Sequence, residues 1–435
     1  MSIGTIALYS LGVLLFVLGL AASIGLHEFG HLIPAKRFGV RVPQYFIGFG
    51  PTVWSRTVGG TEYGLKGIPL GGYVKLVGML PPASPRHPDN RRTALGRLVA
   101  DAREADHELI DPSLPGRPLY TLPVWQKVVT MAGGPVTNLV LAYVIFAAIF
   151  GFYGTHEMSQ STVIGSVSRC VIPADQGGRD CLPGDPAAPA YLAGFRAGDK
   201  VLSFNGTPVH TWDDLTPLIR KNGAATADVV VQRGGEQLTL HPTTVVSLRP
   251  DDNNQTAFHK VGFLGVGPSI VRVTHGLGYT TAQMGTMIKG TAKVLVSMPV
   301  KLYGVARTAL GLQPRDREGP MSVIGAGRVA GEIAATDEVS SSAKIIGVAS
   351  LLASLNLFLG LFNLVPLLPL DGGHIAGALY EGVKRRLARL FGRPDPGHAD
   401  VARLLPVAYL VGVAFLVMTL LLVYVDLVDP IRIFS

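Results

Sequence analysis

Five consecutive residues, His27-Glu28-Phe29-Gly30-His31, combine the side chains that could hydrolyse a peptide bond. On a helix, two histidines four positions apart lie on one face, where both imidazoles can bind zinc. The glutamate that follows the first histidine is placed to act as a general base. The motif comes directly after Met1–Leu26, which carries no charged side chain and is long enough to span a bilayer. A zinc hydrolase motif at the edge of a membrane indicates proteolysis of a membrane-embedded substrate.

A catalytic zinc site needs a third protein ligand and an open position for water. Asp371 is the best candidate, because it ends an apolar stretch where a carboxylate is costly unless a cation compensates for it. We therefore predict that His27, His31 and Asp371 bind Zn²⁺ and that Glu28 is catalytic. Asp371 has an alternative role as the cap of the following helix. His374 is either a further polar group beside the metal or an ordinary residue at a helix start.

The composition is that of an integral membrane protein. Of 435 residues only 16% are charged, against about a quarter in soluble domains, and the mean hydropathy is +0.36. Four stretches without Asp, Glu, Lys or Arg are long enough to cross a bilayer: Met1–Leu26, Val128–Tyr153, Ile345–Leu370 and Leu404–Val425. The first could be a signal peptide, but it lacks a basic start and a cleavage site, so we interpret it as a retained span.

Basic residues set the expected orientation. Lys and Arg gather in residues 36–127 and 384–403, and the positive-inside rule places both segments in the cytoplasm. Both termini and residues 154–344 then lie outside, and the active site lies near the cytoplasmic face. The pI of 9.4 reflects cytoplasmic loops facing anionic lipid, not a nucleic-acid partner. Nothing in the sequence indicates the oligomeric state.

Residues 40–79 are rich in glycine, aromatic and β-branched side chains, which is typical of short strands broken by Gly and Pro. Such backbone enters a membrane only when it is buried in protein or lines a wet cavity. We expect a sheet that dips toward the active site and could pair with an unwound substrate. Asn138 and Asn363 lie in apolar stretches, where each serves either helix packing or substrate binding.

Residues 162–246 read as a compact soluble domain. Val229–Arg233 and Gln237–His241 flank Gly234-Gly235 as a hairpin, and Trp212–Lys221 reads as a helix. The run Ala193–Val209, AGFRAGDKVLSFNGTPV, resembles a PDZ domain of the circularly permuted bacterial type. Such a domain binds peptides by strand addition; the alternative is a scaffold without a ligand.

Cys170 and Cys181 are the two cysteines and lie in a Gly/Pro/Asp-rich loop of this external stretch. In an oxidising compartment they would form a disulfide; otherwise they are a pair of free thiols. Their spacing matches no zinc site.

Taken together, the sequence predicts a polytopic α-helical membrane protein of about four transmembrane helices with a membrane-associated β-sheet and one extracytoplasmic PDZ domain. The expected segments are a first transmembrane helix with HExxH (1–36), a membrane-associated β-sheet (37–80), a cytoplasmic insertion (81–122), a second transmembrane helix (123–155), a PDZ domain and tail (160–272), an amphipathic surface helix and connector (276–342), a third transmembrane helix with the Asp ligand (343–371), a cytoplasmic segment (372–403) and a fourth transmembrane helix (404–427).

The combined motifs resemble one family. HExxH at the end of an N-terminal span, GGPVTN at 133–138, one PDZ segment and NLVPLLPLDGGH at 363–374 are similar to the site-2 proteases, in a single-PDZ form like that of actinobacteria. The resemblance implies zinc held by His27, His31 and Asp371, with Glu28 as the base. It also implies a bacterial inner or plasma membrane enzyme that cuts the transmembrane segment of single-pass substrates such as anti-sigma factors, after a first extracytoplasmic cut.

Two other classes of function compete with this one. A non-catalytic PDZ-containing membrane scaffold would carry a structural metal site, but such a site is closed by four protein ligands, whereas three are found here. A transporter would show internal repeats, and none is evident in the sequence.

Overall fold

The computed structural model describes residues 2–431 except 84–88, 90, 112, 177–178, 251–257, 317–318 and 338. It divides into two compact units. The helical unit comprises Met1–Phe152 and Gly276–Ser435, and the β unit comprises Tyr153–His275.

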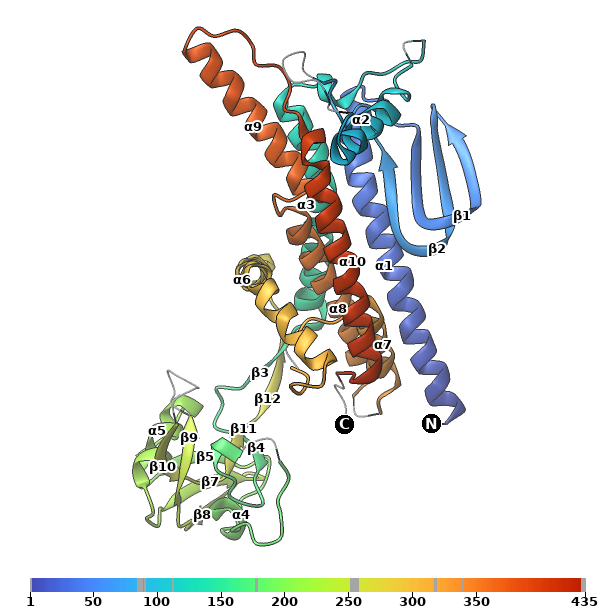
Figure 1. Ribbon diagram of the computed structural model, residues 1–435. Coiled ribbons are helices and arrows are strands. Elements are labelled where there is room, and N and C mark those ends of the chain that lie inside the picture. Colours follow the sequence, from blue (N-terminus) through green and yellow to red (C-terminus); the bar gives the residue numbers. More distant parts are fainter. Residues whose placement is uncertain are drawn as a thin grey trace. The chain divides into compact units, whose positions relative to one another are not determined.

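The helical unit contains the long apolar helices that the sequence predicts (Figure 1). Four helices of the described residues are long and apolar enough to cross a membrane: Ile3–Arg37, Val124–Tyr153, Ser341–Asn363 and Val401–Val428. The prediction of a polytopic helical membrane protein is therefore confirmed. The helices of this unit are α1 (Ile3–Arg37), α2 (Ala94–His107), α3 (Val124–Ala148), α6 (Leu277–Ala309), α7 (Val323–Ala335), α8 (Ser341–Asn363), α9 (Asp371–Leu390) and α10 (Leu405–Val428), with short turns at Leu119–Thr121, Ile149–Tyr153 and Val401–Leu404.

The third apolar stretch differs from the prediction of one helix over 343–371. Helix α8 ends at Asn363, and Asp371 begins a separate helix, α9. Pro366 and Pro369 cause the break, because proline has no N–H to donate and disfavours helical backbone in the residue before it. The carboxylate of Asp371 thus stands at a helix start, where a negative charge is favourable.

Helix α7 lies within the connector at 276–342, where the sequence predicts only one amphipathic helix. Its first residues are Val323-Ile324-Gly325-Ala326-Gly327. Because glycine lowers helix propensity, the sequence does not predict a helix here. Packing stabilises it instead. Ala326 and Ala330 are buried against Phe16 and Leu20 of α1.

Residues 44–75 form two long strands, β1 (Gln44–Val58) and β2 (Thr61–Lys75). Sequence analysis predicts shorter strands, and the pairing register explains why the long strands behave as shorter ones. Tyr45 pairs with Tyr63 and also with Val74, so the two strands fold back on themselves and act as shorter segments. The segment Gly72–Lys75 pairs with Gln44–Ile47.

The ends of the helical unit separate two groups of elements. In Figure 1 the start of α1 and the end of α10 lie at one end of this unit, and α2 and the C-terminal part of α9 lie at the other. The His27–His31 motif lies in the C-terminal part of α1, toward the α2 end.

The β unit has a four-stranded sheet in the order β6-β5-β7-β8, with three further strand pairs, β9 with β10, β4 with β11 and β3 with β12. The predicted hairpin is confirmed as β7 (Val229–Arg233) and β8 (Glu236–Leu240), and the predicted helix as α5 (Trp212–Asn222), which begins with a capping box between Thr211 and Asp214. The remaining elements are β3 (Thr155–Met158), β4 (Ile164–Val167), a turn at Ala174–Gln176, α4 (Pro189–Leu192), β5 (Lys200–Phe204), β6 (Thr207–Pro208), β9 (Val245–Pro250), β10 (Phe258–Phe263), β11 (Val266–Pro268) and β12 (Ile270–Val273).

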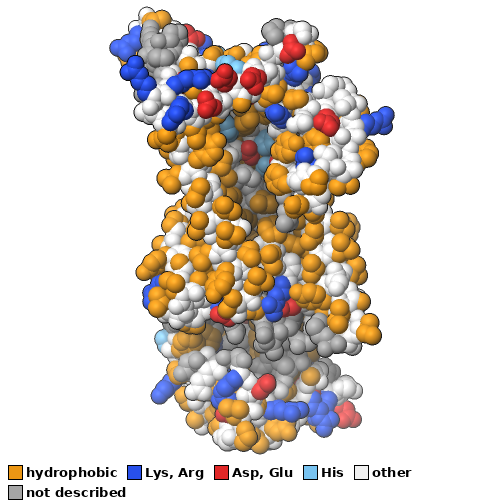
Figure 2. Space-filling view, turned by 45° about the vertical axis from the view of Figure 1, so that its right-hand side comes forward, with side chains coloured by type: hydrophobic (Ala, Val, Ile, Leu, Met, Phe, Trp, Pro, Cys, Tyr) orange, Lys and Arg blue, Asp and Glu red, His pale blue; other side chains and the backbone are white. Residues whose placement is uncertain are grey.

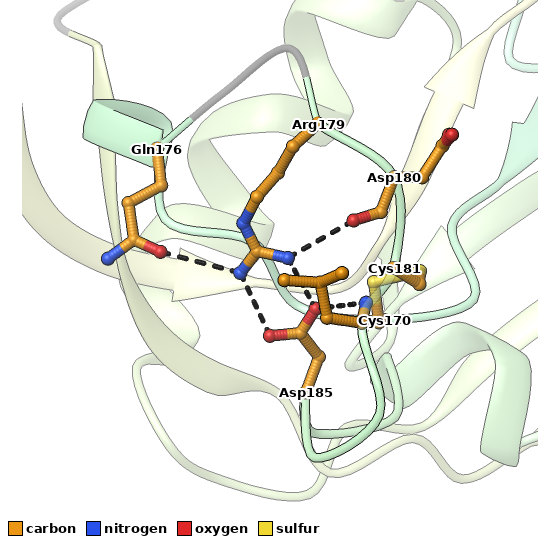
Figure 3. Close-up of a disulfide and its surroundings, with 7 residues drawn as sticks. Cys170, Gln176, Arg179, Asp180, Cys181 and Asp185 are labelled. Atoms are coloured by element: carbon orange, nitrogen blue, oxygen red, sulfur yellow. Dashed lines mark hydrogen bonds and ion pairs between the residues drawn. A yellow bond between two sulfur atoms is a disulfide. The ribbon is translucent and has the colours of Figure 1, made fainter.

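A disulfide joins Cys170 and Cys181 in this unit (Figure 3). Beside it, the Arg179 guanidinium donates to both carboxylate oxygens of Asp185 at 2.6 and 2.9 Å. The hydrogen bonds from Arg179 and from the Leu182 N–H lower the pKa of Asp185 to about 2. The loop is therefore closed by a covalent bond and by an ion pair.

We expect replacement of both cysteines by serine to destabilise this part of the β unit. Opening a loop with a sequence separation of 11 restores conformational freedom to the unfolded chain, worth about 2–3 kcal/mol in the chain-entropy account. Hydrogen exchange of the full chain in detergent should show faster exchange in β4 and α4. Unchanged exchange there would contradict a stabilising role for the disulfide.

Candidate active site

Two histidines and one aspartate meet in the helical unit. His27 and His31 lie on α1, and Asp371 is the first residue of α9. Nε2 of His27 lies 3.3 Å from Nε2 of His31. Each of these nitrogens lies 3.3 Å from Oδ2 of Asp371. Helices far apart in the sequence thus bring three possible metal ligands together.

This triangle has the dimensions of a zinc site. With zinc–ligand bonds of about 2.0–2.1 Å, adjacent ligand atoms of a tetrahedron are about 3.3–3.4 Å apart. All three measured separations are 3.3 Å. Two imidazoles and one carboxylate are a donor set that catalytic zinc uses, with the fourth position left for water. The residues present therefore fit the ion.

The main chain of α3 orients the imidazole of His31. Its Nδ1 lies 2.8 Å from the carbonyl oxygen of Thr130. A ring nitrogen facing a carbonyl must donate, so Nε2 keeps its lone pair for a metal. Sequence analysis does not identify Thr130, because a carbonyl acceptor leaves no signal in residue type. Nδ1 of His27 is buried without a hydrogen-bond partner among the described residues.

Glycines allow α1 and α3 to approach at this point. A Cβ atom added to Gly30 would collide with the carbonyl oxygen of Gly133, and one added to Gly133 would collide with that of Gly30. A Cβ atom on Gly134 would meet Nε2 of both His27 and His31. The small residues at 133–134, which the sequence indicates for helix packing, also leave the space beside the imidazoles open.

We expect Gly134→Ala to weaken zinc binding about 10- to 100-fold, because overpacking by one methyl group costs about 1–3 kcal/mol. The new methyl would press on both Nε2 atoms, so the loss should fall on the metal and not on folding alone. Competition with a chelator measures the affinity. Gly285→Ala on α6, where a Cβ meets nothing within 4 Å, is the matched control. A Gly134→Ala protein with wild-type zinc affinity would refute the view that Gly134 keeps space open beside the two imidazoles.

Two glycines after Asp371 hold the start of α9 against the preceding loop. A Cβ atom on Gly372 would collide with the main chain of Leu364 and Val365. One on Gly373 would collide with the main chain of Leu367 and Leu368. The Asp-Gly-Gly sequence is therefore explained by a chain reversal that sets the carboxylate beside α1.

A cavity of about 330 Å³ surrounds this group. In Figure 2 a hollow in the apolar surface exposes acidic and histidine side chains. Glu28 faces β2 here, since a Cβ on Gly72 would lie 3.3 Å from Cγ of Glu28. The cavity lining combines α1, β2, α3, α8 and the start of α9: Ile24, His27, Glu28, His31, Gly71, Gly72, Tyr73, Val74, Leu76, Met79, Asn138, Leu359, Asn363, Pro369 and Asp371.

The two candidate amides reach the same cavity, whereas His374 does not line it. Asn138 is buried on α3, and its Oδ1 has no hydrogen-bond partner in the described part of the chain. Asn363 is the last residue of α8. His374 instead lines a smaller cavity with Lys127, Glu381 and His398. His374 is not among the three residues whose possible ligand atoms come together.

Long apolar helices that enclose histidines, a carboxylate and a further glutamate define a membrane-embedded hydrolase of the zinc type. A family model for peptidase family M50 matches residues 15–393. The chain belongs to this family, the site-2 proteases.

Individual relatives agree with this assignment. The chain is 33% identical over 434 residues to the zinc metalloprotease Rip1 of Mycobacterium tuberculosis, covering 98% of this chain and 99% of that protein. It is 31% identical over 446 residues to Rip1 of Mycolicibacterium smegmatis, covering 98% of this chain and 100% of that protein. Over 384 residues it is 29% identical to the metalloprotease MmpA of Caulobacter vibrioides, covering 86% and 87%.

These matches confirm the prediction of a membrane zinc metalloprotease with Zn²⁺ as its cofactor. They do not support the alternative of a non-catalytic scaffold.

Proposed function

We propose that this enzyme cuts within the transmembrane segment of single-pass membrane proteins such as anti-sigma factors, after another protease has made an extracytoplasmic cut. The observation that supports this most is the polar cavity itself. It places three possible zinc ligands and Glu28 among apolar membrane helices, next to the edge of a β-sheet.

The chemistry follows from the roles of four side chains. His27, His31 and Asp371 would hold the zinc ion. When bound, zinc lowers the pKa of a ligated water toward about 7 and polarises the scissile carbonyl. Glu28 lies outside the ligand triangle, so its carboxylate is free to take the proton of the attacking water and return it to the leaving amine.

The β-sheet offers a way to expose the peptide bond. A carbonyl in a helix is shielded and already hydrogen-bonded, so the substrate must unwind before attack. Gly72–Lys75 pairs with Gln44–Ile47 on one side, and no strand of the described chain pairs on its other side. Tyr73 and Val74 line the cavity. A substrate that adds here as a strand exchanges helix hydrogen bonds for ladder hydrogen bonds.

Asn138 and Asn363 are suited to bind the unwound substrate. An amide side chain offers a donor pair and an acceptor, which match the N–H and C=O groups of a main chain. The unpartnered Oδ1 of Asn138 in the cavity wall supports this role, because a buried acceptor without a partner is costly.

The distribution of basic residues indicates how the chain is oriented in the membrane. Residues 36–127 contain α2 and residues 384–403 contain the C-terminal part of α9, and both lie at the end of the helical unit opposite the start of α1 and the end of α10 (Figure 1). The positive-inside rule places that end in the cytoplasm. The cavity then lies toward the cytoplasmic leaflet, from which water can enter.

For the β unit we propose an extracytoplasmic PDZ domain that recognises the trimmed substrate. Its support is the resemblance of Ala193–Val209 to PDZ sequences and the disulfide between Cys170 and Cys181, which suits an oxidising compartment. Cleavage inside the membrane would release a cytoplasmic factor from its anchor.

Co-expression of the full chain with single-pass membrane proteins tests the proposal. Each substrate is supplied both full-length and truncated on its extracytoplasmic side, and mass spectrometry locates the cut. We expect cleavage of the truncated form within its apolar segment, abolished by zinc chelation. Cleavage only in soluble regions, or no preference for truncation, would overturn it.

A further inference from the structure

A carboxylate on α9, ten residues beyond Asp371, is buried among donors. The Glu381 side chain is only 3% exposed. Its two oxygens accept from Nζ of Lys127 at 2.9 Å each, and one accepts from the Ala399 N–H at 3.0 Å. Nη2 of Arg385 lies 3.2 Å away. Burial alone would raise the pKa of the Glu381 carboxyl, but hydrogen bonds from His398, Lys127 and the Ala399 N–H hold it at about 2.

Lys127 connects this carboxylate to the histidine ligands. It lies on α3, one turn before Thr130, whose carbonyl oxygen accepts from His31. The Lys127–Glu381 pair therefore joins the helix that orients His31 to the helix that begins with Asp371.

Arg103 of α2 extends the contacts to the loop before α10. Its side chain is 6% exposed and donates to Asp400 at 2.9 Å and to Asp89 at 3.0 Å. Asp400 follows Ala399, the main-chain donor to Glu381. The insertion after β2, for which the sequence gives no role, is thus tied to the environment of α9.

Asp106, one turn after Arg103 on α2, completes the connection to the sheet. Its carboxylate accepts from the Gly78 N–H at 3.2 Å and from the Leu80 N–H at 2.8 Å. These donors come directly after β2 and flank Met79, which lines the active-site cavity. One set of contacts therefore connects the edge of β2 at Gly72–Lys75 that is unpaired in the described chain, called the β2 edge, through α2 to α9 and α3.

We propose that Asp106, Arg103, Asp400, Glu381 and Lys127, called the α2–α9 network, position Asp371 and the β2 edge for catalysis. The inference deepens the proposed function and rests on it. Glu381 is a positioning residue for the metal ligand, and Asp106 is a positioning residue for the substrate-binding edge.

The energetics favour positioning over simple stabilisation. Replacing a buried ion pair with apolar side chains is often neutral or stabilising, so the pair is weak evidence for a stability role. Several donors converge on the one carboxylate of Glu381. This arrangement instead fixes the axial position of α9 relative to α3. A slip of one helical turn would move Asp371 by about 5.4 Å, far more than the 3.3 Å separations of the site allow.

The test compares Glu381→Gln and Asp106→Asn in the full-length enzyme. We expect Glu381→Gln to weaken zinc affinity about 10- to 100-fold, the loss typical of groups that orient ligands, to change the visible spectrum of the cobalt-substituted enzyme and to lower kcat. Asp106→Asn should raise KM severalfold with the cobalt spectrum unchanged. The exposed Arg386→Gln on α9 and Asp101→Asn on α2 are matched controls.

The double variant Lys127→Met/Glu381→Met covers the case in which Glu381→Gln fails to fold. It should melt near the wild-type temperature and still show the altered cobalt spectrum expected for Glu381→Gln. If Glu381→Gln, or the folded double variant, leaves the spectrum, zinc affinity and kcat unchanged, the network is only structural and the inference is wrong. A wild-type enzyme that shows no zinc-dependent cleavage would instead refute the proposed function.

Discussion

Glu28→Gln should bind zinc as tightly as the wild type and lose at least about 100-fold in cleavage rate, the contribution typical of a general base. The substitution keeps the shape of the side chain against Gly72 of β2. It removes the group that can take a proton, but none of the three side chains of the ligand triangle. Zinc content by elemental analysis and the rate on a single-pass substrate measure the two effects separately.

The matched control is Glu104→Gln on α2, an exposed glutamate whose side chain is 60% accessible and lies outside the cavity lining. It should retain full activity. A Glu28→Gln enzyme that still cleaves near the wild-type rate would remove Glu28 from the mechanism, and another base would have to be found.

What the sequence reveals of the active site depends on the kind of signal. His27 and His31 are predictable because helical periodicity alone places them on one face. Asp371 is predictable because a carboxylate at the end of an apolar stretch calls for a cation. Thr130 is not, since its contribution to His31 is a main-chain carbonyl.

The fold shows the same division. The four apolar helices follow from length and composition, which a bilayer constrains strongly. Helix α7 is not predicted because its Gly-rich sequence has a low helix propensity, whereas its packing against α1 becomes visible only in the structure. The separation of α8 from α9 is marked by Pro366 and Pro369, but the apolar character continues across it and suggests one span.

Long-range polar contacts are the hardest to foresee. Lys127 and Glu381 are 254 residues apart in the chain, and Arg103 and Asp400 are 297 apart. A single sequence does not show which residues of α3 and α9 face each other. A charged residue that is buried in an ion pair therefore cannot be distinguished from one on the surface. The contacts that tie the insertion at 81–122 to the rest of the chain are visible only in the structure.

Asp371→Ala should lose zinc and activity together. Only the imidazoles of His27 and His31 would then remain of the triangle, and the fall in affinity should exceed the about 10- to 100-fold caused by losing an outer-shell partner. Removing a first-turn carboxylate also costs α9 about 0.3–1 kcal/mol of dipole stabilisation, too little to account for such a loss. Dialysis against a chelator, followed by elemental analysis, gives the stoichiometry and affinity.

Asp371→Ser separates the two roles of this residue. Serine is favoured at helix starts but is not among the usual zinc ligands, so this variant should keep α9 intact and still lose the metal. If instead both variants held one zinc per chain with wild-type affinity, the carboxylate would serve only the helix start. The ion would then have to be bound by another side chain of the cavity, with Glu28 the nearest acidic residue in its lining, and the division between ligand and base would have to be redrawn.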